Sequence, residues 1–120
     1  MTHEWLEFAS KYDKGRFVSV SAGGAICWSR SVHKDIDEPK EVYFRYCLDP
    51  LAIAIVPIVK PSDLPKLGVR TYKVYRQGVC ARGVLTLLGV KVEQRQRVSC
   101  HIEDGKLVIE LEQLKTVPTK

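Results

Sequence analysis

The residues best suited to chemistry in this sequence are arginines and lysines concentrated in its second half. One group surrounds a glycine in a stretch typical of a hairpin turn, and a second lies in the segment KVEQRQR, residues 91–97. Such cations contact phosphates, and an arginine can also read the edge of a guanine. The candidate nucleic-acid contacts are Lys73, Arg76, Arg82, Lys91, Arg95 and Arg97, with Arg30 from the first half. A solvated loop or a charged strand edge would carry the same residues, so both interpretations stay open.

The cysteines and histidines do not form a metal-binding pattern. Cys27, Cys47, Cys80 and Cys100 are 20, 33 and 20 residues apart, whereas paired ligands of structural zinc sites are only a few residues apart. Cys100 and His101 are neighbours on an expected strand, so they point to opposite faces. We expect buried thiols in a reducing compartment, with no metal and no cofactor.

The sequence also lacks the spacing of a catalytic site. Four serines lie between residues 19 and 31 around the Gly23-Gly24 pair, without the flanking glycines of a nucleophile elbow. The segment SAGGA has no lysine of the kind found in a phosphate-binding loop. We therefore expect a protein that is not an enzyme.

Composition and length are typical of one globular domain. The chain has 120 residues, of which 45% are hydrophobic and 28% charged. Its longest apolar run, residues 51–59, is too short for a membrane helix, and the N-terminus lacks the pattern of a secretion signal. These features predict a cytoplasmic protein with no membrane association.

The net charge of +5 is unevenly distributed. Residues 1–60 contain eight basic and eight acidic residues, whereas residues 61–120 contain eleven and six. This asymmetry is typical of a nucleic-acid-facing surface, and also of a modestly basic soluble protein.

Residues 1–15 are predicted to form an amphipathic helix. Trp5, Phe8 and Tyr12 fall on one face of it, where they would pack on the core or bind a protein partner.

Two longer stretches then share one order of elements. In residues 17–58 we expect a strand, a turn at Gly23-Gly24, a strand, a short helix capped by Ser29, and a hairpin turning at residues 48–50. The return strand of that hairpin, residues 51–56, is apolar on both faces and should be central in its sheet.

The same order recurs in residues 72–111. Here the turns are expected at Gln77-Gly78 and Asp104-Gly105, and the short helix ends at Gly89. One strand is expected over residues 97–103, before the second of these turns. Residues 59–71 form the predicted linker, and residues 112–120 a polar tail.

One constant offset in residue number relates the two stretches. It aligns Val20 with Val74, Gly24 with Gly78, Phe44 with Val98 and Tyr46 with Cys100. The offset is even and so preserves strand parity, as a duplication requires, although chance would also explain so few identities. The expected fold is mostly β with short helices (α+β), a pseudo-twofold closed barrel of two β-β-α-β-β repeats after the N-terminal helix.

The second stretch resembles the AbrB/SpoVT-type swapped-hairpin domain. The resemblance rests on Val74, Gly78, the Leu87-Leu88-Gly89-Val90 helix end, and Glu103-Asp104-Gly105-Lys106 before Leu107-Val108-Ile109. It implies two half-units that interdigitate into one small barrel, commonly in DNA-binding transcription factors or antitoxins. Two half-units in one chain are similar to the MraZ arrangement.

Some positions depart from the family pattern. Val79 follows Gly78 where arginine is common, Gly83 stands where proline is common, and the Asp-x-x-x-Arg signature of the MraZ type is absent. The resemblance implies a small transcriptional regulator or antitoxin-like protein that contacts duplex DNA through basic hairpin residues. A homodimer would enlarge its recognition surface.

The alternative hypothesis is a protein–protein interaction module. It would use the aromatic residues of the N-terminal helix, Trp5, Phe8 and Tyr12, together with Trp28 on the first hairpin.

Overall fold

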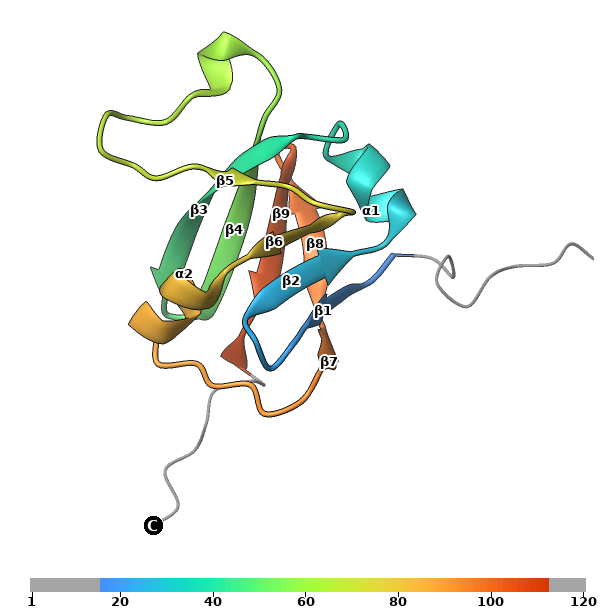
Figure 1. Cartoon of the computed structure of the whole chain (residues 1–120), viewed down its shortest axis with the longest axis vertical. Helices are drawn as coiled ribbons and strands as arrows, with labels where there is room; N and C mark the ends of the chain where they lie inside the picture. The colour runs from blue at the N-terminus through green and yellow to red at the C-terminus, as the bar shows by residue number, and fades with distance from the viewer. Residues whose placement is uncertain (1–15, 113–120) are drawn as a thin grey trace, which may run out of the picture.

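The computed structural model describes residues 16–112, which form an α+β fold dominated by strands (Figure 1). The first part contains β1 (Val18–Val20), β2 (Ala25–Trp28), α1 (Arg30–Asp35), β3 (Glu41–Leu48) and β4 (Leu51–Ile58). The second part contains the 3-10 helix η2 (Pro61–Asp63), β5 (Tyr72–Lys73), β6 (Gly78–Cys80), α2 (Arg82–Leu87), β7 (Gln96–Val98), β8 (Cys100–Glu103) and β9 (Lys106–Glu110). The predicted N-terminal helix and nearly all of the predicted tail lie outside the described residues.

The strands form two antiparallel sheets. Sheet A has the order β6-β2-β1-β7, and sheet B has the order β5-β3-β4-β9-β8. β4 is therefore the middle strand of sheet B, which confirms the expectation drawn from its two apolar faces. No helix within residues 16–112 is long and apolar enough to cross a membrane.

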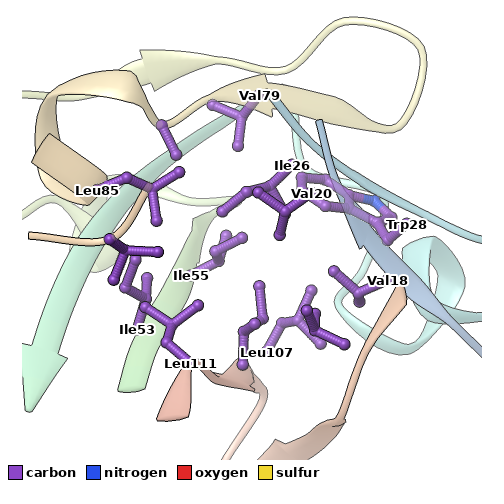
Figure 2. Packing of buried hydrophobic residues seen from close by; sticks show 14 of the residues in the cluster. Val18, Val20, Ile26, Trp28, Ile53, Ile55, Val79, Leu85, Leu107 and Leu111 are labelled. Atoms are coloured by element: carbon purple, nitrogen blue, oxygen red, sulfur yellow. The ribbon is translucent and has the colours of Figure 1, made fainter. Parts of the chain in front are cut away.

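One hydrophobic core lies between the two sheets. Val18, Val20 and Ile26 point inward from sheet A, while Ile53 and Ile55 point inward from sheet B (Figure 2). All five are fully buried. These positions follow the alternation of each strand, because successive side chains point to opposite faces.

The strand pairing does not form the closed barrel that the sequence predicts. One strand was predicted across residues 97–103, but the structure divides it at Ser99. β7 pairs with β1 in sheet A, whereas β8 pairs with β9 in sheet B. Among the named strands, none of sheet A pairs with one of sheet B, so the hydrogen-bonded ladder does not continue around a barrel.

The two halves of the chain pair with each other in a symmetric way. In β4 and β9, Ala54 lies opposite Val108, flanked by the pairs Ile53↔Ile109 and Ile55↔Leu107. The offset that carries Val20 to Val74 also carries Ile53 to Leu107 and Ile55 to Ile109, so applying it to these three pairs returns the same three pairs. The same offset relates two pairs of the β2·β6 ladder. It carries Ala25 to Val79 and Ile26 to Cys80, so the pair Ala25↔Cys80 corresponds to the pair Ile26↔Val79.

The first strand of each long hairpin departs from this offset. Phe44 pairs with Ile55, and Cys100 pairs with Ile109, so β8 lies two positions further along the chain than the offset predicts. The expected alignment of Phe44 with Val98 is therefore wrong by two residues, although strand parity is kept. The shift arises at the hairpin tip. Between Cys100 and Ile109 the second hairpin has two residues fewer than the first has between Phe44 and Ile55.

The two short hairpins use different residues to turn. Gly24 has a φ of 89° in the first, as expected, but the second turns at Arg76 and Gln77, whose φ values are 48° and 62°. Gly78 instead belongs to β6, so the predicted turn at Gln77-Gly78 is displaced by one residue. The predicted turn at Asp104-Gly105 is confirmed, with φ values of 51° and 77°.

Candidate nucleic-acid interface

The outer face of sheet A carries one row of side chains across all its strands. The register places Arg97 opposite Ser19, Ser19 opposite Cys27, and Cys27 opposite Gly78. A bridge from Gly78 to Tyr75 extends the row beyond β6. Residues that are opposite in an antiparallel ladder share a face, and the inward set of this sheet is apolar. The outer row therefore runs from an arginine over three small residues to a tyrosine.

The small residues make the middle of this face shallow. A Cβ placed on Gly78 would lie 3.0 Å from the Cys27 Sγ atom, so the thiol occupies the space above the glycine. Ser19 and Cys27 are buried and half-buried. The strands of sheet A contain no acidic residue. A polyanion could therefore approach the backbone of this sheet without meeting a carboxylate on these four strands.

The β7 edge of the face is basic. The Arg97 guanidinium lies 4.2 Å from the centre of the Phe17 ring, which holds the cation over the end of β1. Arg95 is exposed and lies two residues before Arg97, a spacing that favours the same face.

The opposite edge contains the second short hairpin. Tyr75 is 72% exposed, and Arg76 is exposed at the tip of the turn. Lys73 lies opposite Glu41 in the β5·β3 ladder, so a carboxylate partly offsets its charge. Arg76 is therefore the stronger cation of this edge.

Arg82 and Lys91 both lie beside the first hairpin turn. Both line a cavity of about 180 Å³ together with Gly23 and Gly24. The Arg82 Nε–H donates to the Gly23 carbonyl at 3.4 Å. The structure thus joins two predicted site residues from the second half of the chain to a turn from the first half.

Two expected contributors lie elsewhere. Arg30 is exposed at the first position of α1, outside sheet A and outside the cavity with Arg82. Trp28 is 3% exposed, and its Nε1–H donates to His33 Nδ1 at 3.0 Å. Its burial removes Trp28 from the proposed protein-interaction surface, because a core position cannot contact a partner.

The sequence correctly predicted the capping role of one serine, but it wrongly predicted that all four cysteines are buried. Ser29 Oγ accepts the Val32 N–H and caps α1 as predicted, while Ser21 Oγ accepts the Ala25 N–H in the first turn. The prediction of buried thiols is wrong for Cys47 and Cys80, which are both exposed. Within residues 16–112, no group of three or more His, Cys, Asp or Glu residues could hold a metal ion.

Sequence reasoning missed the middle of the face and its tyrosine. The residues in the middle of the face alternate along their strands with core residues. Once the strand pairing is known, this alternation puts Ser19, Cys27 and Gly78 on one face. The pairing itself joins segments far apart in the sequence, such as β2 and β6, and no local pattern specifies it. Tyr75 was assigned to a strand, and its exposure follows from the displaced turn.

No family model, no curated protein and no solved structure matches this chain.

Proposed function

We propose that this protein binds duplex DNA through the outer face of sheet A, as a small regulator or an antitoxin-like protein. The observation that carries this proposal is the row across sheet A, in which small residues lie between Arg97 and Tyr75. Arg76, Arg95 and Arg97 occupy its edges, while its four strands carry no acidic side chain.

Each edge would perform a different part of the binding. Arg97 and Arg95 would contact phosphates of one strand, and such contacts release condensed counterions and make affinity depend on salt. Arg76 protrudes at a hairpin tip, where its guanidinium could reach a base edge in a groove. Lys73, Arg82 and Lys91 would add phosphate contacts, whereas Arg30 would contribute only at longer range.

The same proposal includes a swapped-hairpin arrangement of two related half-units. Its support is the pairing symmetry, because β2 pairs with β6 and β4 with β9 under one constant offset between the two halves. Independent repeats that each paired internally would not produce this exchange. Sheet A itself combines both halves, because its inner strands β1 and β2 come from the first half and its edge strands β6 and β7 from the second.

We also propose a cytoplasmic location and a homodimer. All four cysteines are free thiols, which suits a reducing compartment. A dimer would double a recognition face that is small in one chain.

Anisotropy measurements with labelled random-sequence duplexes, at about 50 and 200 mM salt, test the proposal. The informative variant is Arg76→Ala/Arg97→Ala, which should bind at least about tenfold more weakly with a shallower salt dependence. Its matched control is Arg45→Ala/Lys106→Ala, which removes the same charge from sheet B and should change affinity little. Equal losses in both double variants would contradict a specific face, and no binding at low salt would reject the function.

The protein-interaction hypothesis stays a prediction. It depends on Trp5, Phe8 and Tyr12, which lie outside the described residues. A chain lacking residues 1–15 separates the two functions, since duplex binding through sheet A should survive that deletion. Loss of duplex binding together with retained folding would mean that residues 1–15 carry the duplex contacts and would contradict binding through sheet A.

A further inference from the structure

A notch at the first hairpin turn combines features that suit a small oxyanion. Its cavity of about 180 Å³ is lined by the turn residues Ser21 to Gly24, by Arg82, Thr86 and Lys91, and by apolar side chains. Among the described residues, no acidic one lines it. The notch therefore brings two cations and two hydroxyls together, with no carboxylate among the described residues of its lining.

The turn and Arg82 are fixed to each other. The Ala81 N–H donates to the Gly24 carbonyl at 2.8 Å, and the Arg82 Nε–H reaches the Gly23 carbonyl at 3.4 Å. A guanidinium has five N–H donors, so this contact orients the group and leaves others for a ligand. A positioned arginine is suited to bidentate recognition of a phosphate.

Gly24 is the residue that permits this close approach. Its φ is 89°, and a Cβ there would lie 2.9 Å from the Arg82 Cα atom. Any side chain would strain the turn and push Arg82 away from it. The need for glycine at this position is thus explained by the contact that forms the notch.

Another cavity of the molecule lacks this chemistry. The cavity of about 290 Å³ on the outer face of sheet B contains Arg45 and Lys106, but Glu103 also lines it. That carboxylate would repel an anion. The contrast favours the notch at the first turn over the larger cavity.

We propose that the notch binds one phosphate group, with Arg82 as the main ligand and Lys91 as the second cation. The phosphate would come either from a nucleic-acid backbone or from a free phosphate or phosphate monoester. The backbone source rests on the proposed function and deepens it, because it would anchor the duplex at a defined point beside β7. Phosphate binding itself is measurable without DNA.

The first experiment titrates the ¹⁵N-labelled full-length chain with inorganic phosphate at constant ionic strength, with chloride as the reference anion. The expected result is saturable shifts of the amides of Gly23, Gly24 and Arg82. Arg82→Gln should weaken binding about tenfold or more, since it removes a charge-assisted hydrogen bond. Arg45→Gln, an equal change of charge on sheet B, should leave the shifts as they are. Weak shifts spread over all basic segments, or unchanged binding in Arg82→Gln, would overturn the proposal.

A second pair of variants tests the geometry. Gly24→Ala should abolish the saturable shifts, because its Cβ would displace Arg82. Gly68→Ala controls for backbone strain, since Gly68 has a φ of 96° but open space around its Cβ position. Retained phosphate binding in a folded Gly24→Ala protein would contradict the notch. If Gly24→Ala fails to fold, the Arg82→Gln result decides.

Duplex binding by the same Arg82→Gln variant distinguishes the two sources of the phosphate. It also distinguishes failure of the phosphate site from failure of the DNA-binding proposal. If phosphate binds and Arg82→Gln also weakens duplex binding severalfold, the backbone is the ligand. If phosphate and a nucleoside monophosphate bind but the duplex does not, the notch stands and the DNA-binding proposal fails. If the duplex binds normally in Arg82→Gln and phosphate gives no saturable shift, the notch fails and the DNA-binding proposal stands.

Discussion

The outer faces of the two sheets differ in charge, although both sheets close the same core. The strands of sheet A contain one charged residue, Arg97. The strands of sheet B contain three basic residues and three acidic ones, Arg45, Lys73, Lys106, Glu41, Glu103 and Glu110. Sheet B thus balances its own charges, and sheet A leaves a face that an anion can approach.

The arrangement of sheet B shows how that balance is reached locally. On its outer face Glu103 lies opposite Lys106 across the β8·β9 hairpin. His101 Nε2 lies 3.3 Å from Glu103 Oε1 on the same strand. Such exposed pairs add little stability, but they cancel the local field. The overall charge of +5 therefore matters less for function than the places where carboxylates are missing.

The largest expected effect tests whether both sheets depend on one core. Ile26→Ala in sheet A and Ile53→Ala in sheet B remove fully buried side chains. Each should lower the free energy of unfolding by about 2–5 kcal/mol, because transfer and cavity terms add. Urea unfolding followed by circular dichroism should show one transition in both variants, whereas a separate transition for either sheet would break the shared-core description.

A smaller effect concerns the shallow middle of the outer face of sheet A. Gly78→Ala would place a Cβ 3.0 Å from Cys27 Sγ and 3.2 Å from the Ile26 carbonyl oxygen. We expect about 1–3 kcal/mol of destabilisation from this overpacking. Thermal unfolding should show partial recovery in Cys27→Ala/Gly78→Ala, because the thiol contact is gone. A loss in the double variant as large as in Gly78→Ala would mean that backbone crowding, not the thiol, requires the glycine.

Gly83 offers a stabilising change outside both sheets. It lies in α2, and a Cβ there would meet nothing within 4 Å. Gly83→Ala should raise the free energy of unfolding by about 0.5–1 kcal/mol, because alanine loses less conformational entropy in a helix. Chemical denaturation measures the gain, and duplex affinity should stay the same. A decrease in stability would show that α2 needs a glycine for a reason other than space.

The smallest effect is a difference in how the two sheets respond to acid. The Asp63 carboxylate accepts the N–H groups of Val59 and Lys60, both at 3.0 Å, and these bonds hold its pKa below the usual aspartate range. Because the folded-state pKa is lowered, this stabilisation is present above the ordinary aspartate pKa and is lost as the pH falls through the folded value.

An NMR acid titration measures this response. The amides of Val59 and Lys60, which follow β4, should titrate below about pH 3.9, and Asp63→Asn should abolish the step. The strands of sheet A contain no carboxylate of their own and should show no comparable local step. A midpoint at or above the ordinary aspartate pKa would contradict the hydrogen-bonded geometry.

Local patterns predicted most of the elements of this fold. The Ser29 cap, the Asp104-Gly105 turn and the central position of β4 all follow from side chains close in sequence. The division of one expected strand at Ser99 does not follow from such local patterns. Its first part pairs with β1 in sheet A, and its second part pairs with β9 in sheet B. Long-range pairing, of β7 with β1 in the first half of the chain, decided that outcome.

The sequence predicted which basic residues belong to the candidate site, but it did not predict how they are arranged on the surface. Arg82 and Lys91 were both identified, yet their position beside Gly23-Gly24 depends on the β2·β6 ladder. Arg30 was grouped with the others by charge alone, and the short helix α1 carries it outside sheet A. The exposure of Cys80 depends on which face of β6 is covered, and the sequence of β6 does not specify it.

The native cysteines report on the two faces without any substitution. Cys80 is exposed on the outer face of sheet A, opposite Ala25, and Cys47 is exposed on the outer face of sheet B, opposite Ala52. Cys100 faces inward, and burial raises the pKa of its thiol, so it should react slowest of these three.

The most direct test of the proposed interface is therefore thiol labelling with N-ethylmaleimide, read residue by residue by mass spectrometry, with and without saturating duplex DNA. We expect that duplex slows labelling of Cys80 severalfold and leaves the rate at Cys47 unchanged. Protection of Cys47 with Cys80 still reactive, or no protection of either thiol in a saturated complex, would contradict binding through sheet A.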